Sequence, residues 1–254
     1  MRTYDNKVMD LLLGFCALVY SPPDYGKTRS AATCIPPVAF INNEHKDPRL
    51  VLASTGAEID YFEPDDFDNE MELLNEWITK AKEGSLKYKT VFKDGLTFTQ
   101  SQYKLGLEED RYVARVIKKE AREGMIDRYR LDQSDWGTAN SMLIRNTSLF
   151  NKLSKFGVMV ICTAISQDNP KWNITLGCGP ALQGKEFTSV LPGFFDLIGL
   201  IVEPWHIMED GTIRSPMIDF HSEDGKFLSR VTGEKLARHH RGPLNWTKIG
   251  EMLR

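Results

Sequence analysis

The stretch FCALVYSPPDYGKTRSAATCI, residues 15–35, joins an apolar run of strand length to a segment of small residues. Its centre, SPPDYGKT (21–28), ends as the phosphate-binding pattern G-x-x-x-x-G-K-[ST] ends, but Ser21 stands where that pattern has glycine. Such a loop needs a buried strand before it and a helix after it, because backbone N–H groups and the helix N-terminus then point at the phosphates. FCALVY and RSAATCI predict both. We therefore interpret 21–28 as an altered but competent loop; the alternative is a loop that has lost its ligand.

The residue types in this loop predict a site for ATP and Mg²⁺. Lys27 is expected to reach the β- and γ-phosphates, and the hydroxyl of Thr28 is expected to bind Mg²⁺. Serine at position 21 is the smallest polar substitute for a glycine that would leave the backbone free, and the two prolines restrict the loop further. The expected nucleotide-binding residues are Ser21, Pro22, Pro23, Asp24, Tyr25, Gly26, Lys27, Thr28 and Arg29.

Composition indicates an ordinary globular chain of the cytoplasm, or of a host cytoplasm if the chain is viral. Its 254 residues are 41% hydrophobic and 26% charged, and no apolar run approaches the roughly 20 residues of a membrane span. The N-terminus MRTYDNK lacks the apolar core of a signal peptide. Four scattered cysteines without a C-x-x-C pair predict neither a metal site nor a disulfide framework. The net charge of −3 excludes a uniformly basic surface, so nucleic acid would have to bind local basic patches.

Apolar runs of strand length alternate with longer amphipathic segments, as in βα units around a parallel sheet. The predicted fold class is α/β: a central, mostly parallel β-sheet flanked by helices, with a C-terminal β-hairpin region. A single domain over 1–254 is the simplest organisation, since the chain has no internal repeat and no low-complexity linker. Strands are expected at 15–20, 38–42, 88–98, 157–166 and 194–203, hairpin strands within 205–232, and helices at 29–35, 71–84 and 140–155.

Two stretches break this alternation. Residues 105–136 form a highly charged insertion, and its centre, 111–130, carries basic residues that could share one helical stripe. Such a stripe could follow a nucleic-acid backbone; the alternative is a solvated helix of mixed charge. Residues 167–193 are loop-like and rich in Gly, Pro, Asn and Lys.

Two carboxylates near the ends of apolar strands can complete the nucleotide site. Asp94 in KTVFKDGLT is expected to bind Mg²⁺; the alternative is an aspartate that begins a turn before Gly95. Lys93 beside it is unusual for a buried strand. Glu44 in FINNEHKDP follows the next strand after the phosphate-binding loop, so it is expected beside the phosphates as the base or water-orienting group.

The order of these segments resembles that of the RecA-type recombinases. The sequence is similar in more detail to compact RecA-core ATPases of bacteriophages and archaeal viruses, the Sak-type single-strand-annealing recombination proteins. That resemblance covers most of residues 12–252, with loose motifs in a specific order: YKTVFKDGLT, DWGTANSMLIRNTSLFNKL, GPALQGK, FFDLIGLIVE and KLARHHRGPLN. The chain departs from the pattern at Ser21, at Asn43, where a small residue or threonine is common, and in the insertion around 111–130.

The resemblance implies a RecA-like P-loop fold and several further roles. Glu44 would activate the attacking water, and the polar sensor that ends the strand 157–166 would be Ser166 or Gln167. The loop after it would line a channel for single-stranded DNA, because cations suit phosphates and flat rings suit unstacked bases. Ordinary surface lysines and a packed tryptophan are the alternative. The candidate DNA contacts are Lys171, Trp172 and Lys185.

Basic residues near the C-terminus of RecA-like assemblies can reach the nucleotide of a neighbouring subunit. Lys235, Arg238 and Arg241 are the candidates here; the alternative is a basic patch with no catalytic part. A homo-oligomer, either a ring or a filament, is therefore expected. Single-stranded DNA is the expected ligand, and a single-strand-binding protein is a further candidate partner.

The residues and the resemblance together imply a Mg²⁺-dependent, DNA-stimulated ATPase that acts on single-stranded DNA in recombination or annealing, of viral or proviral origin. Two alternatives stay open. One is a nucleotide-binding assembly or regulatory protein with little turnover, and the other is a DNA translocation or packaging motor with the same core. The expected catalytic residues are Lys27, Glu44, Gln167, Lys235, Arg238 and Arg241, and the expected metal ligands are Thr28 and Asp94.

Overall fold

A mostly parallel β-sheet organises the chain, which is an α/β protein. The computed structural model describes residues 14–253 except 45, 118–132, 172 and 174. The parallel strands are β1 (Cys16–Ser21), β2 (Val38–Asn42), β3 (Ile59–Phe62), β4 (Thr90–Asp94), β5 (Met159–Asp168) and β7 (Leu197–Glu203). The antiparallel additions are β6 (Cys178–Pro180) on β5, β10 (Met217–Asp219) on β7, and β11 (Arg241–Pro243) on β10. The main order across the sheet is β11-β10-β7-β1-β5-β4-β2-β3.

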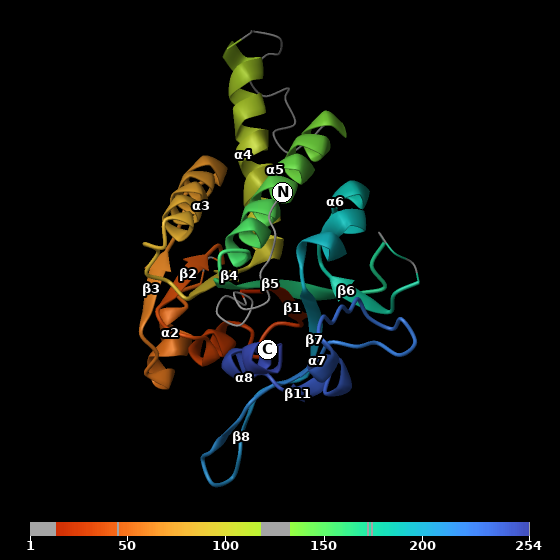
Figure 1. The fold of residues 1–254 in the computed structure, drawn as a ribbon. Helices are drawn as coiled ribbons and strands as arrows, with labels where there is room; N and C mark the ends of the chain where they lie inside the picture. The colour runs from red at the N-terminus through yellow and green to blue at the C-terminus, as the bar shows by residue number, and fades with distance from the viewer. Residues whose placement is uncertain (1–13, 45, 118–132, 172, 174, 254) are drawn as a thin grey trace, which may run out of the picture.

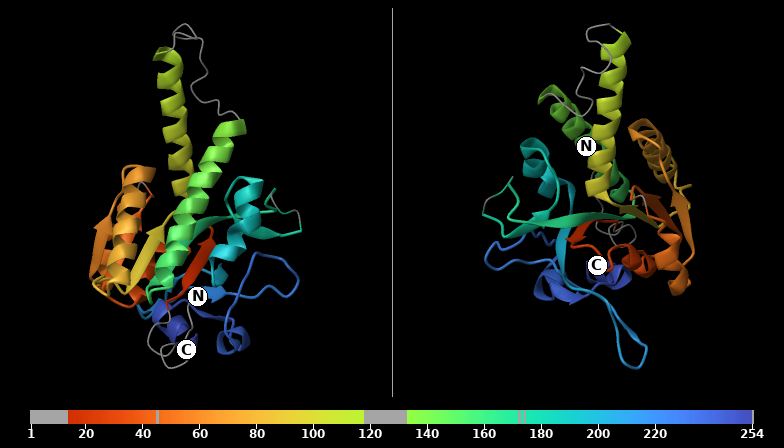
Figure 2. Two further views of the ribbon diagram at one scale, coloured as in Figure 1. Left: turned by 45° about the horizontal axis from the view of Figure 1, so that its top comes forward. Right: turned by 180° about the vertical axis from the view of Figure 1, so that it is seen from behind.

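Helices cover both faces of this sheet. One face packs against three long helices and the short helix α6, with α4 projecting away from the body of the molecule (Figure 1). Further short helices lie on the other face, and the two further views show the same division (Figure 2). The first group is α3 (Phe67–Lys82), α4 (Leu96–Ile117), α5 (Gln133–Ser154) and α6 (Lys185–Val190). The second group is the 3₁₀-helix η1 (Thr28–Thr33), α2 (Arg49–Leu52), α7 (Glu234–Arg238) and α8 (Trp246–Met252). No described helix is long and apolar enough to cross a membrane.

β1 lies inside the sheet because its apolar run can be buried on both sides. Cys16, Leu18 and Tyr20 join the core beneath the long helices, while Ala17 and Val19 join the core beneath the short ones. Every residue of the strand is buried, as is usual for a parallel strand covered on both faces. The strand predicted at 15–20 is therefore confirmed, with a shift of one residue.

The predicted helix at 29–35 is wrong in type. The segment forms a six-residue 3₁₀-helix over Thr28–Thr33, and the chain is extended at Cys34 before Pro36 and Pro37. Short helical pieces between a loop and a proline commonly take this tighter form. The predicted strand at 88–98 is also too long, because it ends at Asp94 and α4 begins two residues later. Gly95, with φ of +97°, makes the turn between them.

The two segments predicted to interrupt the alternation of strands and helices, 105–136 and 167–193, contain more regular secondary structure than expected. Within 105–136, the described parts belong to α4 and α5, and residues 118–132 lie outside the described residues. The segment 167–193 contains the end of β5, β6, α6 and the 3₁₀-helix η3 (Leu191–Phe194). The edge strand β3 was not predicted. The expected hairpin is present as β8 (His206–Ile207) and β9 (Ile213–Arg214), which protrude from the body (Figure 1).

Candidate functional site

A cavity of about 500 Å³ opens where β1, β2 and β4 end. Because these strands are parallel, their carboxyl ends share one edge of the sheet, and ligands of open α/β sheets bind at such edges. In the sheet, β2 lies on one side of β1 and β7 lies on the other side. The chain therefore extends the sheet in opposite directions from β1. The lining comes from the loop after β1, the segment after β2, Asp94, Phe98 of α4, Ile165 of β5, and Trp205.

Lys27 lies almost buried at the base of this cavity. Its Nζ donates to the carbonyl oxygens of Ser21 at 3.0 Å and Pro22 at 2.8 Å, and to Oγ of Ser21 at 3.1 Å. Burial lowers the pKa of the Lys27 ammonium, while the negative charges of Asp94 and Glu44 oppose that shift. The lysine therefore has three oxygen partners within its own loop, and it would have to exchange some of them for phosphate oxygens.

Ser21 replaces the first glycine of the loop pattern without backbone strain. The loop uses the left-handed region at Asp24, with φ of +64°, and at Gly26, with φ of +92°, but not at position 21. Aspartate tolerates that region better than most residues. Ser21 is fully buried at the end of β1, and its hydroxyl oxygen accepts from Lys27. The serine is thus a partner of the lysine and does not line the cavity.

Asp94 is buried at the end of β4 and is held by two threonines. Its Oδ2 accepts from Oγ1 of Thr28 at 2.7 Å, and its Oδ1 accepts from Oγ1 of Thr163 at 2.6 Å. The Thr163 hydroxyl also accepts from the backbone N–H of Gly95 at 2.9 Å. Burial raises the pKa of Asp94, and the two threonine hydrogen bonds oppose that rise. Sequence reasoning missed Thr163, because only the pairing of β4 with β5 brings it to Asp94.

Glu44 enters the cavity from the segment that follows β2. A Cβ atom on Gly95 would lie 2.8 Å from Cγ of Glu44, so the absence of a side chain at position 95 leaves room for the glutamate. Burial, followed by the nearby charge of Asp94, raises the pKa of Glu44 to about 6. A carboxylate with such a pKa can accept a proton near neutral pH.

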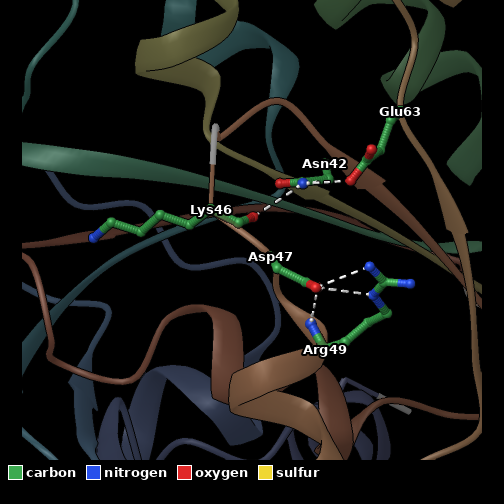
Figure 3. A network of polar contacts seen from close by, with 5 residues as sticks. All are labelled: Asn42, Lys46, Asp47, Arg49 and Glu63. Atoms are coloured by element: carbon green, nitrogen blue, oxygen red, sulfur yellow. Dashed lines mark hydrogen bonds and ion pairs between the residues drawn. The ribbon is translucent and has the colours of Figure 1, made fainter.

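Two hydrogen-bonded groups brace the segment that carries Glu44 (Figure 3). Nδ2 of Asn42 donates to the carbonyl oxygen of Lys46 at 3.2 Å and to Oε1 of Glu63 at 2.9 Å. Oδ1 of Asp47 accepts from the backbone N–H of Arg49 at 2.9 Å and from Nε of the same residue at 2.9 Å. Asn42 therefore ties the start of the turn after β2 to Lys46 and to Glu63, while the Asp47–Arg49 contact is local to the start of α2.

The described residues fit a Mg²⁺ ion held together with phosphates. They contain no group of three or more His, Cys, Asp and Glu side chains that could hold a metal. Mg²⁺ does not need one, because it is commonly bound by one or two carboxylates, substrate phosphates and water. Thr28 and Asp94 provide a hydroxyl and a carboxylate side by side. Oδ1 of Asn42, on the same cavity wall, is buried and has no hydrogen-bond partner among the described residues.

Trp205, which follows β7, also lines the cavity and was not predicted. Its indole N–H donates to the carbonyl oxygen of Asp24 at 3.0 Å. The guanidinium carbon of Arg29 lies 5.3 Å from the centre of its ring. No sequence motif marks this residue, which reaches the loop only because β7 pairs with β1.

The structure brings only some of the remaining predicted site residues into this cavity. Gln167 lies on β5 opposite Gly179 of β6. Pro22 and Tyr25 belong to the loop but do not line the cavity, whereas Pro23, Asp24 and Gly26 do. Lys171 is exposed on the segment after β5, Lys185 is the first residue of α6, and Trp172 lies outside the described residues.

The predicted basic residues of the C-terminal segment are exposed and also lie outside the lining. Arg238 on α7 forms an ion pair with Glu234 at 3.7 Å, and Arg241 on β11 forms one with Glu203 at 2.9 Å. Lys235 is on α7 as well. The structure therefore does not bring these three side chains to the cavity within one copy of the chain.

A scan against protein-family models gives no match for this chain, and a search of curated proteins finds no similar sequence.

Proposed function

We propose that this chain is a RecA-like P-loop ATPase that binds Mg²⁺ and ATP in the cavity at the end of β1 and acts on single-stranded DNA. The observation that carries the proposal is the convergence of Lys27, Thr28, Glu44 and Asp94 on one cavity from three strand ends. These are the residue types that phosphoryl transfer requires: a lysine for the phosphates, a hydroxyl and a carboxylate for the metal, and a base. The central, mostly parallel sheet is compatible with the RecA-like fold that the sequence resembles.

Each of these side chains has a task in hydrolysis. Glu44 accepts a proton from the water that attacks the γ-phosphorus, as the bond to the leaving oxygen of ADP breaks. Lys27 leaves its carbonyl partners and binds phosphate oxygens. Thr28 and Asp94 would hold Mg²⁺, which supplies positive charge against the phosphates. Thr163 keeps the carboxylate of Asp94 oriented. The protein thus contributes positioning and charge stabilisation.

A low-turnover nucleotide-binding protein is the second candidate, and the contacts of Lys27 favour it. The ammonium already has three oxygen partners inside the protein, so binding phosphate requires it to give up part of that set. An assembly or regulatory protein would tolerate slow exchange, whereas an efficient ATPase would not. Steady-state turnover distinguishes the two, because only the ATPase should turn over faster with single-stranded DNA.

Calorimetric ATP binding and steady-state phosphate release, with and without single-stranded DNA, test the proposed site. Lys27→Ala should abolish detectable ATP binding, because the phosphates lose their main cation. Ser21→Gly is the matched variant in the same loop: it removes one oxygen partner of Lys27 but keeps the lysine, so ATP binding should persist and turnover should stay equal or rise. Unchanged ATP affinity in Lys27→Ala would exclude this phosphate-binding role.

The DNA part of the proposal rests on the segment after β5, where Lys171 is exposed. Lys171→Ala combined with Trp172→Ala should weaken binding to a single-stranded oligonucleotide, since a cation and a stacking ring are lost together. Lys82→Ala on α3, also an exposed lysine, is the control and should bind normally. Normal binding by the double variant would move the DNA site away from this segment.

A further inference from the structure

The ring of Trp205 lies beside the phosphate-binding loop and is held there by contacts with two loop residues. Its indole N–H donates to the carbonyl oxygen of Asp24 at 3.0 Å. A Cβ atom on Gly26 would lie 3.1 Å from Cδ1 of the ring, so the glycine leaves room for the indole close to the loop. The side chain is half-buried and contributes to the cavity lining. The ring is therefore fixed in orientation while part of it stays accessible from the cavity.

Further groups of the cavity that Trp205 lines suit a flat, uncharged ligand. The guanidinium of Arg29 lies over the indole with its carbon 5.3 Å from the ring centre, and both side chains line the cavity. Pro48 and Val51 add apolar lining from α2 and the turn before it. The proposed phosphate chemistry uses Lys27, Thr28, Glu44 and Asp94 and gives these four groups no part in it. The cavity volume of about 500 Å³ is typical of a site for a whole small molecule.

We propose that the base of the nucleotide stacks on the ring of Trp205, next to Arg29. The site then binds purine nucleoside triphosphates with little discrimination between adenine and guanine. This inference rests on the proposed nucleotide site and adds where the base lies and which bases are accepted. Stacking reads the face of a base, and every base has one, so ATP and GTP bind within a few-fold of each other. Pyrimidines offer a smaller face to the indole, so CTP binds more weakly.

The test compares nucleotides with inorganic tripolyphosphate, which carries the phosphates without a base. Titration calorimetry of the full chain with Mg²⁺ gives the dissociation constants of ATP, GTP, CTP and tripolyphosphate. Trp205→Leu keeps an apolar side chain but removes the aromatic face, so ATP affinity should fall about 5- to 100-fold relative to tripolyphosphate. Trp205→Phe keeps a smaller aromatic face and loses the hydrogen bond to Asp24, so it should retain much of the preference for ATP.

The ratio of the dissociation constants of ATP and tripolyphosphate distinguishes two roles of Trp205: stacking on the base, and holding the phosphate-binding loop in place. If Trp205 only positions the loop, Trp205→Leu weakens ATP and tripolyphosphate equally and leaves the ratio unchanged, which overturns the inference. Equal binding of ATP and tripolyphosphate by the unmodified chain also overturns it, while the proposed phosphate site stands. Binding of neither ligand by the unmodified chain, with thermal unfolding showing a folded protein, defeats the proposed function and this inference together.

Discussion

Among single residues, Glu44 is a carboxylate whose pKa is raised in the cavity, and the charge of Lys27 partly opposes that rise. Burial and the charge of Asp94 raise the pKa of Glu44 to about 6, and Lys27 and Lys46 hold it from rising further. Glu44 is therefore ionised and able to accept a proton at neutral pH, and it loses that ability in mild acid.

The pH dependence of ATP turnover tests this assignment. Since the pKa of Glu44 is raised to about 6, kcat/KM should be close to its plateau above that pH and should fall as the pH drops through it. Glu44→Gln should bind ATP but turn it over roughly 10²-fold more slowly, and its profile should lose this acidic limb. The variant is also the control for titration of ATP itself, which it leaves unchanged. An identical limb in Glu44→Gln would assign the titration to another group.

At the scale of elements, a buried ion pair fastens β4 to the long helices. Lys93, directly before Asp94, contacts the carboxylate of Glu70 on α3, and both side chains have 0% exposure. The hydroxyl of Tyr103 on α4 donates to the same carboxylate at 3.4 Å, and Nζ of Lys93 lies 5.8 Å from the ring centre of Phe150 on α5. Burial lowers the pKa of Lys93, and Glu70 opposes that shift. The strand that presents Asp94 is thus tied to three helices.

Removing one partner of this pair should be far more destabilising than removing both. Lys93→Met leaves Glu70 buried without a counter-charge, so the free energy of unfolding should fall by about 3–5 kcal/mol in urea titrations. Lys93→Met with Glu70→Leu should recover most of that loss. Lys80→Met is the matched control, because Lys80 pairs with Glu76 on the exposed side of α3 and should matter by about 0.3–0.5 kcal/mol. A double variant as unstable as the single one would contradict this account.

Across the molecule, the cavity lies at the carboxyl ends of the parallel strands, and the predicted basic residues of the C-terminal segment are not part of its lining. Lys235, Arg238 and Arg241 are exposed and line no part of the cavity. A cation from a neighbouring subunit could stabilise charge at the γ-phosphate, as an arginine finger does. In a ring or filament, ATP turnover would then belong to the interface between two copies.

Mixing of two inactive variants tests for a shared site. Arg238→Ala should bind ATP but hydrolyse it poorly, and Glu44→Gln should behave likewise for a different reason. A mixture should regain activity, because some interfaces pair an intact Glu44 with an intact Arg238. Specific activity of the unmodified chain should also rise with protein concentration. Lys248→Ala on α8, another exposed cation, is the control and should keep full activity. Turnover independent of concentration, without rescue on mixing, would show a self-contained site.

Contiguous residues were sufficient to predict several features of the fold and of the candidate site. An apolar run buried on both faces predicts β1, and the spacing of Gly26, Lys27 and Thr28 predicts the loop after it. Asp94 and Glu44 were predicted near strand ends because buried apolar runs stop there, and parallel strands bring such ends to one edge. These inferences need only local periodicity and the general rules of parallel sheets.

The distant residues that complete the site depend on how the strands and helices assemble. Thr163 meets Asp94 because β5 pairs with β4, and Trp205 meets the loop because β7 pairs with β1. The pairing of Lys93 with Glu70 likewise depends on how α3 packs against the sheet. A single sequence predicts the faces and ends of its elements from local periodicity. The order of strands and the choice of side-chain partners across tens of residues are set by burial in the assembled core, which no local pattern records.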